Sequence, residues 1–211
     1  MRKIIPTILA ENLEDFNAKL SKLVDFSDEI QIDITDGEFT SSKTVELIDI
    51  KELPSNKTFE AHLMVADPLD YIFHCKRLGI KRIIFHDEVE ANTAEVINKI
   101  KSEGFEVFIA LNPDTQLSQL TPHIPNVDGV LLMSVDPGYG GQELLPGSIV
   151  KIKKLRANFP DVKIGLDGGI NKANIKSLFE DGINIAYIGS GILKAQNPKQ
   201  EWEEFNSIIA E

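Results

Sequence analysis

The 211-residue chain has a single cysteine, Cys75, so no internal disulfide can stabilise it. Scarcity of cysteine is typical of proteins from reducing compartments, and we expect a cytoplasmic protein. Long apolar runs are also missing, because none approaches the roughly 20 residues of a membrane span. The early apolar run 4–10 contains Pro6 and is followed directly by Glu11. It therefore predicts a buried first strand and not a signal peptide.

Positive charge is scarce as well. The chain carries 22 Lys and Arg against 33 Asp and Glu, a formal net charge of −11. This balance argues against nucleic acid and anionic membranes as partners. It leaves small anionic ligands open, because backbone amides can bind a phosphate group without any basic side chain. The chain also lacks a Walker loop, a dinucleotide-binding fingerprint and a nucleophile-elbow serine, so we expect none of these enzyme classes.

What the chain does contain is a regular alternation of short apolar runs and amphipathic stretches. Runs of this kind are typical of parallel strands covered on both faces. The predicted strands are 3–9, 29–34, 58–64, 82–86, 106–111, 129–133, 163–166 and 185–188. The predicted helices are 13–25, 68–78, 90–103, 146–159, 171–180 and 201–210, with weaker patterns at 44–51 and 116–121.

Eight such repeats without a linker predict one domain, 1–211, folded as a (β/α)8 TIM barrel. The rival is a doubly wound open sheet, but no topological break between the repeats favours it. In a barrel, chemistry lies where the strands end at their carboxyl edge. Functional residues are therefore expected at the strand ends.

Three strand ends carry titratable side chains. Alternation places Gln31, Asp33 and Thr35 on one face of the second strand, which is the interior of a barrel. His62 lies near the end of the third strand, and Asp167 follows the seventh. A buried carboxylate is costly unless it is paired, binds a metal or is catalytic. An isolated histidine is usually only hydrogen-bonded, but beside two inward aspartates it favours a metal site.

Glycines cluster after the last three strands. The loop after the sixth strand contains Gly138, Gly140 and Gly141, the seventh ends in Gly168-Gly169, and the eighth in Gly189-Ser190. A single glycine-rich turn is usually only a turn. Three of them at one edge of a barrel predict a phosphate site built from backbone amides.

These motifs resemble those of the ribulose-phosphate 3-epimerase family over nearly the whole chain. The motifs are Pro6-Thr7-Ile8-Leu9, Asp33 with Asp36-Gly37, His62-Leu63-Met64, the loop 135–142, Asp167-Gly168-Gly169-Ile170 and Gly189-Ser190. The resemblance implies a (β/α)8 barrel that interconverts ribulose 5-phosphate and xylulose 5-phosphate. Two aspartates would act on opposite faces of C3, here Asp33 and Asp167, and a divalent metal would stabilise the enediolate.

The resemblance also implies the remaining site residues. Asp33, His62 and Asp167 would hold the metal. The residues implied for binding the sugar phosphate are Thr7, His62, Met64, Met133, Gly138, Tyr139, Gly140, Gly141, Gly168, Gly169, Gly189 and Ser190. The chain departs from the family at Gln31, which replaces a histidine ligand, and a glutamine oxygen is a poor zinc ligand beside imidazole. We therefore expect zinc, manganese or iron(II), bound by three protein ligands and water or bound weakly, with loss of the metal as the alternative.

Two alternatives remain beside the epimerase. One is an epimerase or lyase acting on another sugar phosphate, such as allulose 6-phosphate. The other is a sugar-phosphate-binding homologue without activity, although a mere binder would not need both aspartates. The expected partner is a phosphorylated ketose. Family members are often dimers or hexamers, so we expect a homo-oligomer.

Overall fold

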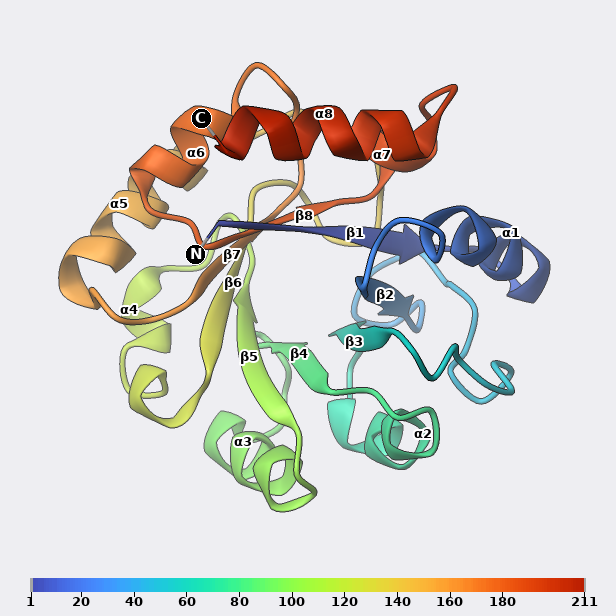
Figure 1. Ribbon diagram of the computed structural model, residues 1–211. Coiled ribbons are helices and arrows are strands. Elements are labelled where there is room, and N and C mark those ends of the chain that lie inside the picture. The colour runs from blue at the N-terminus through green and yellow to red at the C-terminus, as the bar shows by residue number, and fades with distance from the viewer. Residues whose placement is uncertain (1, 211) are drawn as a thin grey trace.

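The computed structural model describes residues 2–210, which form a closed barrel of eight parallel strands in sequence order, surrounded by helices (Figure 1). β1 pairs with β2 on one side and with β8 on the other, which closes the sheet. The strands are β1 (Lys3–Leu9), β2 (Glu29–Thr35), β3 (Thr58–Met64), β4 (Arg82–His86), β5 (Glu106–Leu111), β6 (Gly129–Met133), β7 (Ile164–Asp167) and β8 (Ile185–Ile188). The TIM barrel is therefore confirmed, and the open sheet is wrong.

Six strands have the predicted bounds, and the other two differ by a single residue. β2 runs one residue further, to Thr35, and β7 is shifted by one residue so that Asp167 is its last. The shift places Asp167 within the sheet, where it is registered against Met133 of β6. On the opposite side of the barrel mouth, Asp33 of β2 is registered against His62 of β3.

The helices follow most of the predicted segments. They are α1 (Leu13–Leu23), the 3₁₀ helix η1 (Pro68–Tyr71), α2 (Ile72–Arg77), α3 (Thr93–Ser102), α4 (Leu117–Leu120), the 3₁₀ helix η2 (Ile124–Asn126), α5 (Gly147–Asn158), α6 (Ile175–Asp181), α7 (Ser190–Leu193) and α8 (Pro198–Ala210). α8 packs against both α6 and α1, which completes the outer ring (Figure 1). Among the described residues, no helix combines the length and apolar character needed to cross a membrane.

The prediction of a helix at 44–51 is wrong. Val45 donates its backbone N–H to Ala10 at 2.8 Å and Thr44 donates to Thr35 at 3.1 Å, so the chain is held against β1 and β2. The Leu47 carbonyl, which a helix would bond to the N–H of residue 51, instead accepts from Arg77 at 2.8 Å, and the segment forms only a turn at 47–49. α6 also begins four residues later than predicted, because the Asn171 side chain accepts from Ala173 and Asn174 and caps a separate turn.

The core has two layers. The larger lies between the strands and the helices, and the smaller fills the barrel interior with residues such as Ile84, Phe108 and Tyr187. Inside the barrel, Glu60 accepts from Arg82 at 2.6 Å and from the Tyr187 hydroxyl at 3.2 Å. This buried polar group lies one inward position before His62 on β3, below the strand ends that carry the predicted site.

Candidate active site

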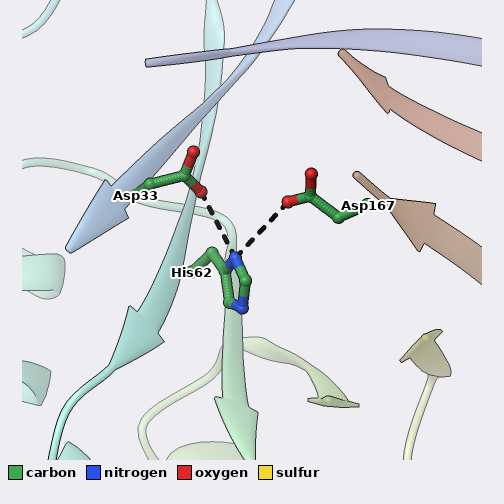
Figure 2. A group of neighbouring side chains, drawn as sticks. All are labelled: Asp33, His62 and Asp167. Atoms are coloured by element: carbon green, nitrogen blue, oxygen red, sulfur yellow. Dashed lines mark hydrogen bonds and ion pairs between the residues drawn. The ribbon is translucent and has the colours of Figure 1, made fainter. Parts of the chain in front are cut away.

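Asp33, His62 and Asp167 converge at the carboxyl end of the barrel. Their side chains come from β2, β3 and β7, and the two carboxylates approach one ring nitrogen of His62 from opposite sides (Figure 2). His62 Nδ1 lies 3.3 Å from Asp33 Oδ1 and 3.7 Å from Asp167 Oδ2. The structure therefore brings together the three residues implied as metal ligands, with Asp33 on the inner face of β2 as strand alternation predicts.

Gln31 lies between the two carboxylates. Its Nε2 donates to Asp33 Oδ1 at 2.7 Å and is 3.3 Å from Asp167 Oδ2. Its Oε1 is buried and has no hydrogen-bond partner among the described residues. The amide thus offsets part of the repulsion between two carboxylates, while its oxygen remains free to accept.

Burial dominates the electrostatics of the cluster. Burial raises the pKa of Asp33, and the hydrogen bonds from Gln31 and Thr7 only partly oppose it. Burial likewise raises the pKa of Asp167, and the charge of Asp33 raises it further. Burial lowers the pKa of His62 to about 4, so the imidazole is neutral near pH 7. A neutral imidazole between two acidic groups has a lone pair available to a cation.

The donor set fits a divalent metal. One nitrogen and two carboxylate oxygens, from His62, Asp33 and Asp167, lie within 4.8 Å of one another. Three such ligands with an open position form a catalytic site for zinc or a similar ion. The unpartnered Oε1 of Gln31 is an oxygen that a rotation of the amide could add to this set. That oxygen would make the set harder than one with two imidazoles.

A cavity of about 630 Å³ opens beside the cluster. Asp33 and Asp167 line it, as do all the residues implied for substrate binding except His62. These lining residues are Thr7, Met64, Met133, Gly138, Tyr139, Gly140, Gly141, Gly168, Gly169, Gly189 and Ser190. His62 is fully buried beneath the cavity, so the structure places it with the carboxylates and not on the cavity wall.

The glycines at the other end of the cavity allow close approach of the chain. Gly169 has a φ of +62°, and a Cβ there would lie 2.2 Å from the backbone nitrogen of Leu144. A Cβ on Gly141, where φ is +86°, would point toward the Ser190 hydroxyl and the Lys194 ammonium group. Lys194 also lines the cavity. The glycine-rich end therefore combines exposed amides, a hydroxyl and one cation, which suits a phosphate group.

A polar contact joins two loops over the cavity. The Tyr139 hydroxyl, in the loop after β6, lies 2.7 Å from the Ser41 hydroxyl in the loop after β2.

Asp36 accepts backbone N–H groups from Glu38, Phe39 and Ala66. Asp36 is therefore a turn residue, although the pair Asp36-Gly37 also belongs to the motifs that carry the family resemblance.

Sequence reasoning left three neighbours of this site out. The first is His86, whose Nε2 lies 3.0 Å from Nε2 of His62. Glu88 lies next to His86, with 3.4 Å between the nearest carboxylate oxygen and Nδ1. Lys194 had no signal beyond its position four residues after Ser190. The pattern His-Asp-Glu at the end of β4 was the one available hint for the first two.

Comparison with known proteins points to one family. Residues 3–193 match the model of the Ribulose-phosphate 3 epimerase family. The chain is 29% identical to ribulose-phosphate 3-epimerase of Schizosaccharomyces pombe, with 94% of this chain and 90% of that protein covered. It is 32% identical to the cytoplasmic isoform of that enzyme from Oryza sativa subsp. japonica, with 93% and 89% covered.

Two solved structures share the fold. One is 3-hexulose-6-phosphate synthase from Salmonella typhimurium, with a TM-score of 0.74, 15% identity, and 99% of this chain and 98% of that chain covered. The other is KGPDC from Streptococcus mutans in complex with a pentose phosphate, with a TM-score of 0.74, 17% identity, and 99% and 97% covered. At these identities the likeness concerns the fold alone. The match to the family model over residues 3–193, together with relatives of about 30% identity along most of the barrel, shows that the chain belongs to the ribulose-phosphate 3-epimerase family.

Proposed function

We propose that this chain interconverts D-ribulose 5-phosphate and D-xylulose 5-phosphate, the isomerase reaction that its family name describes. One observation carries the proposal: Asp33 and Asp167 approach the same nitrogen of His62 from two sides (Figure 2). Both carboxylates also line a cavity with many glycines in its wall. Inversion of a carbon needs one acid–base group on each face of that carbon. Two carboxylates facing each other across a small gap meet this requirement.

The cavity orients the substrate. Its phosphate would be bound by the amides of the loop that contains Gly140 and Gly141, together with Ser190 and Lys194. The opposite end of the sugar would then extend toward Asp33 and Asp167. The complex of the Streptococcus mutans barrel with a pentose phosphate supports such a use of the fold. An acidic protein can bind the phosphate in this way because amides and one ammonium group supply the local positive potential.

The two aspartates would divide the proton transfers. In one direction Asp33 takes the proton from C3, and Asp167 returns a proton to the opposite face. For this the first must be ionised while the second is protonated. Burial raises the pKa of both carboxyls, and their mutual repulsion favours the state in which the pair holds one proton. The Met64 and Met133 side chains in the cavity wall reduce access of water to the reacting carbon.

Asp33, His62 and Asp167 would hold the divalent metal, which we propose to be zinc, manganese or iron(II). When bound, the metal supplies polarisation of the C2 carbonyl and compensates the negative charge that develops on its oxygen. Gln31 distinguishes this chain from a site with two histidines, because it offers an amide oxygen. We expect the metal to bind more weakly here than at a site with a second imidazole.

Two further points belong to the proposal. We expect the chain to work in the cytoplasm, which the naming of the rice relative as a cytoplasmic isoform supports. We also expect a homo-oligomer, either a dimer or a hexamer, which sedimentation equilibrium would test directly.

Proton NMR of ribulose 5-phosphate in D₂O tests the reaction. The protein is stripped of metal and then reloaded separately with zinc, manganese or iron(II). After reaction the metal is removed, so that paramagnetic ions do not broaden the spectrum. We expect deuterium at C3 and the appearance of xylulose 5-phosphate, and both should be lost in Asp33→Asn and Asp167→Asn. Exchange with allulose 6-phosphate alone would move the assignment to another sugar phosphate, and exchange with neither would refute an epimerase.

A further inference from the structure

A chain of three buried side chains extends from the candidate metal site into the wall of the barrel. His62 Nε2 lies 3.0 Å from His86 Nε2, and the two rings are nearly parallel, with an interplanar angle of 15° and 5.1 Å between their centroids. His86 Nδ1 lies 3.4 Å from Glu88 Oε2. Both of these last atoms are buried and have no closer hydrogen-bond partner in residues 2–210. The side-chain oxygen of Asn112, which is also buried and unpartnered, is a second acceptor beside the His86 ring.

The positions of the protons on the two histidines follow from Glu88, which lies at the far end of this row of three side chains. A carboxylate can only accept hydrogen bonds, so Glu88 requires the proton of His86 to reside on Nδ1. Nε2 of a neutral His86 is then an acceptor. The hydrogen between the two rings must therefore belong to Nε2 of His62, which leaves the lone pair of His62 on Nδ1. That atom is the one that faces Asp33 and Asp167.

Glu88 is held in place as a carboxylate. Its Oε1 accepts the backbone N–H of Asn112 at 2.8 Å. Burial raises the pKa of Glu88, but the hydrogen bonds to His86, Thr115 and Asn112 outweigh burial and bring the pKa below its ordinary value. The ammonium group of Lys151 adds positive charge nearby, since it bonds to the carbonyl oxygen of Asn112 at 3.0 Å. On its other side, the His86 ring packs against Phe39 with 4.8 Å between the ring centroids.

We propose that His86 and Glu88 are positioning residues for the metal site, which fix His62 in the tautomer whose Nδ1 lone pair faces Asp33 and Asp167. This inference rests on the metal-assisted function proposed above. It assigns no contact with the substrate to either residue. Partners of this kind, which orient a ligating histidine through its second nitrogen, affect metal affinity by about 10- to 100-fold in other proteins.

Glu88→Gln is the sharpest variant. Its Oε1 can still accept from Asn112, but an NH₂ group then faces His86 Nδ1. This group donates, so it favours a His86 that carries its proton on Nε2 and a His62 that carries its proton on Nδ1. Asp87→Asn is the matched control, because it removes the same charge at the adjacent residue. The Asp87 side chain bonds to Thr93 and not to His86. A second pair is His86→Phe, which keeps a ring but loses the acceptor, and His86→Gln, which retains an acceptor oxygen.

Two measurements decide the inference. The first is the zinc dissociation constant, determined by competition with a chelator. Glu88→Gln and His86→Phe should weaken zinc binding by about 10- to 100-fold, whereas Asp87→Asn should change it less than twofold and His86→Gln should retain most of it. The second is the tautomer of each histidine, read from long-range ¹H–¹⁵N spectra of labelled protein, which contains only four histidines. In zinc-loaded wild type, we expect the proton on Nδ1 of His86 and on Nε2 of His62.

Equal zinc affinities of Glu88→Gln and Asp87→Asn would overturn the inference, as would a wild-type His86 protonated on Nε2. The tautomer of the unsubstituted protein remains informative even if a variant fails to fold. If the wild type binds no divalent metal, the metal part of the proposed function fails. The His86 tautomer in the metal-free protein then still decides this inference, with Nδ1–H as the expected result.

Discussion

The paired aspartates should make the metal-free protein less stable at high pH, and Asp33→Asn should remove this weakness. The sign follows from the pKa shifts. Burial raises the folded-state pKa of Asp33 and of Asp167 above the value in the unfolded chain. The folded protein therefore binds more protons than the unfolded chain in that range, and its stability falls as the pH rises through the folded-state pKa values.

The size of the effect can be worked out from the site. The ligand oxygens of Asp33 and Asp167 lie within 4.8 Å of each other, which gives a repulsion of about 3.5 kcal/mol at an effective dielectric constant of about 20. Asp33→Asn removes this repulsion and keeps Oδ1 as an acceptor for Gln31. The bond from Gln31 weakens by about 1 kcal/mol when its acceptor loses its charge. The net gain at pH 8 is about 2.5 kcal/mol, or ~5–10 °C in Tm for a protein of this size.

Thermal and urea unfolding in the presence of EDTA measure this gain. Asp33→Asn should be more stable than wild type at pH 8, and the difference should shrink at pH 5, where the wild-type pair is protonated. Added divalent metal should stabilise wild type and reduce or reverse the difference. Asp36→Asn is the control with the opposite sign, because Asp36 accepts three backbone N–H groups and its pKa is lowered. A variant Asp33→Asn that is no more stable than wild type at pH 8 without metal would refute the reasoning.

Three other changes test separate parts of the structure. Gln31→His adds an imidazole to the donor set and should tighten zinc binding about tenfold or more and raise turnover. An unchanged zinc dissociation constant in a chelator competition would mean that position 31 does not supply a metal ligand. Gly141→Leu places a side chain against Lys194 at a position where φ is +86°. KM for the phosphorylated substrate should therefore rise at least tenfold in steady-state assays. An unchanged KM would refute the assignment of this loop as the phosphate site. Arg82→Met leaves Glu60 buried without its cation and should lower the free energy of unfolding, measured in urea, by about 3–5 kcal/mol. A loss below about 1 kcal/mol would contradict a stabilising ion pair between Arg82 and Glu60.

Much of this molecule could be predicted from local patterns. Parallel strands buried on both faces appear as short apolar runs, and eight of them with helical patterns between them predicted the barrel and six strand boundaries. Strand alternation then placed Gln31, Asp33 and His62 on the inner face, because side chains of a strand point to opposite faces in turn. The helix predicted at 44–51 is wrong, because the backbone of this segment bonds to groups elsewhere in the barrel. Apolar spacing alone could not reveal those bonds.

The sequence by itself determined which chemical groups stand at the strand ends and that they share the barrel interior. Only the tertiary structure decided how those groups meet. The Gln31 amide reaches Asp167, 136 positions further along the sequence, and His86 lies beside His62 through the pairing of neighbouring strands. Such contacts depend on barrel closure, strand stagger and side-chain rotamers, which no local pattern encodes. The orientation of one amide and the direction of one hydrogen-bonded chain are therefore properties of the folded site.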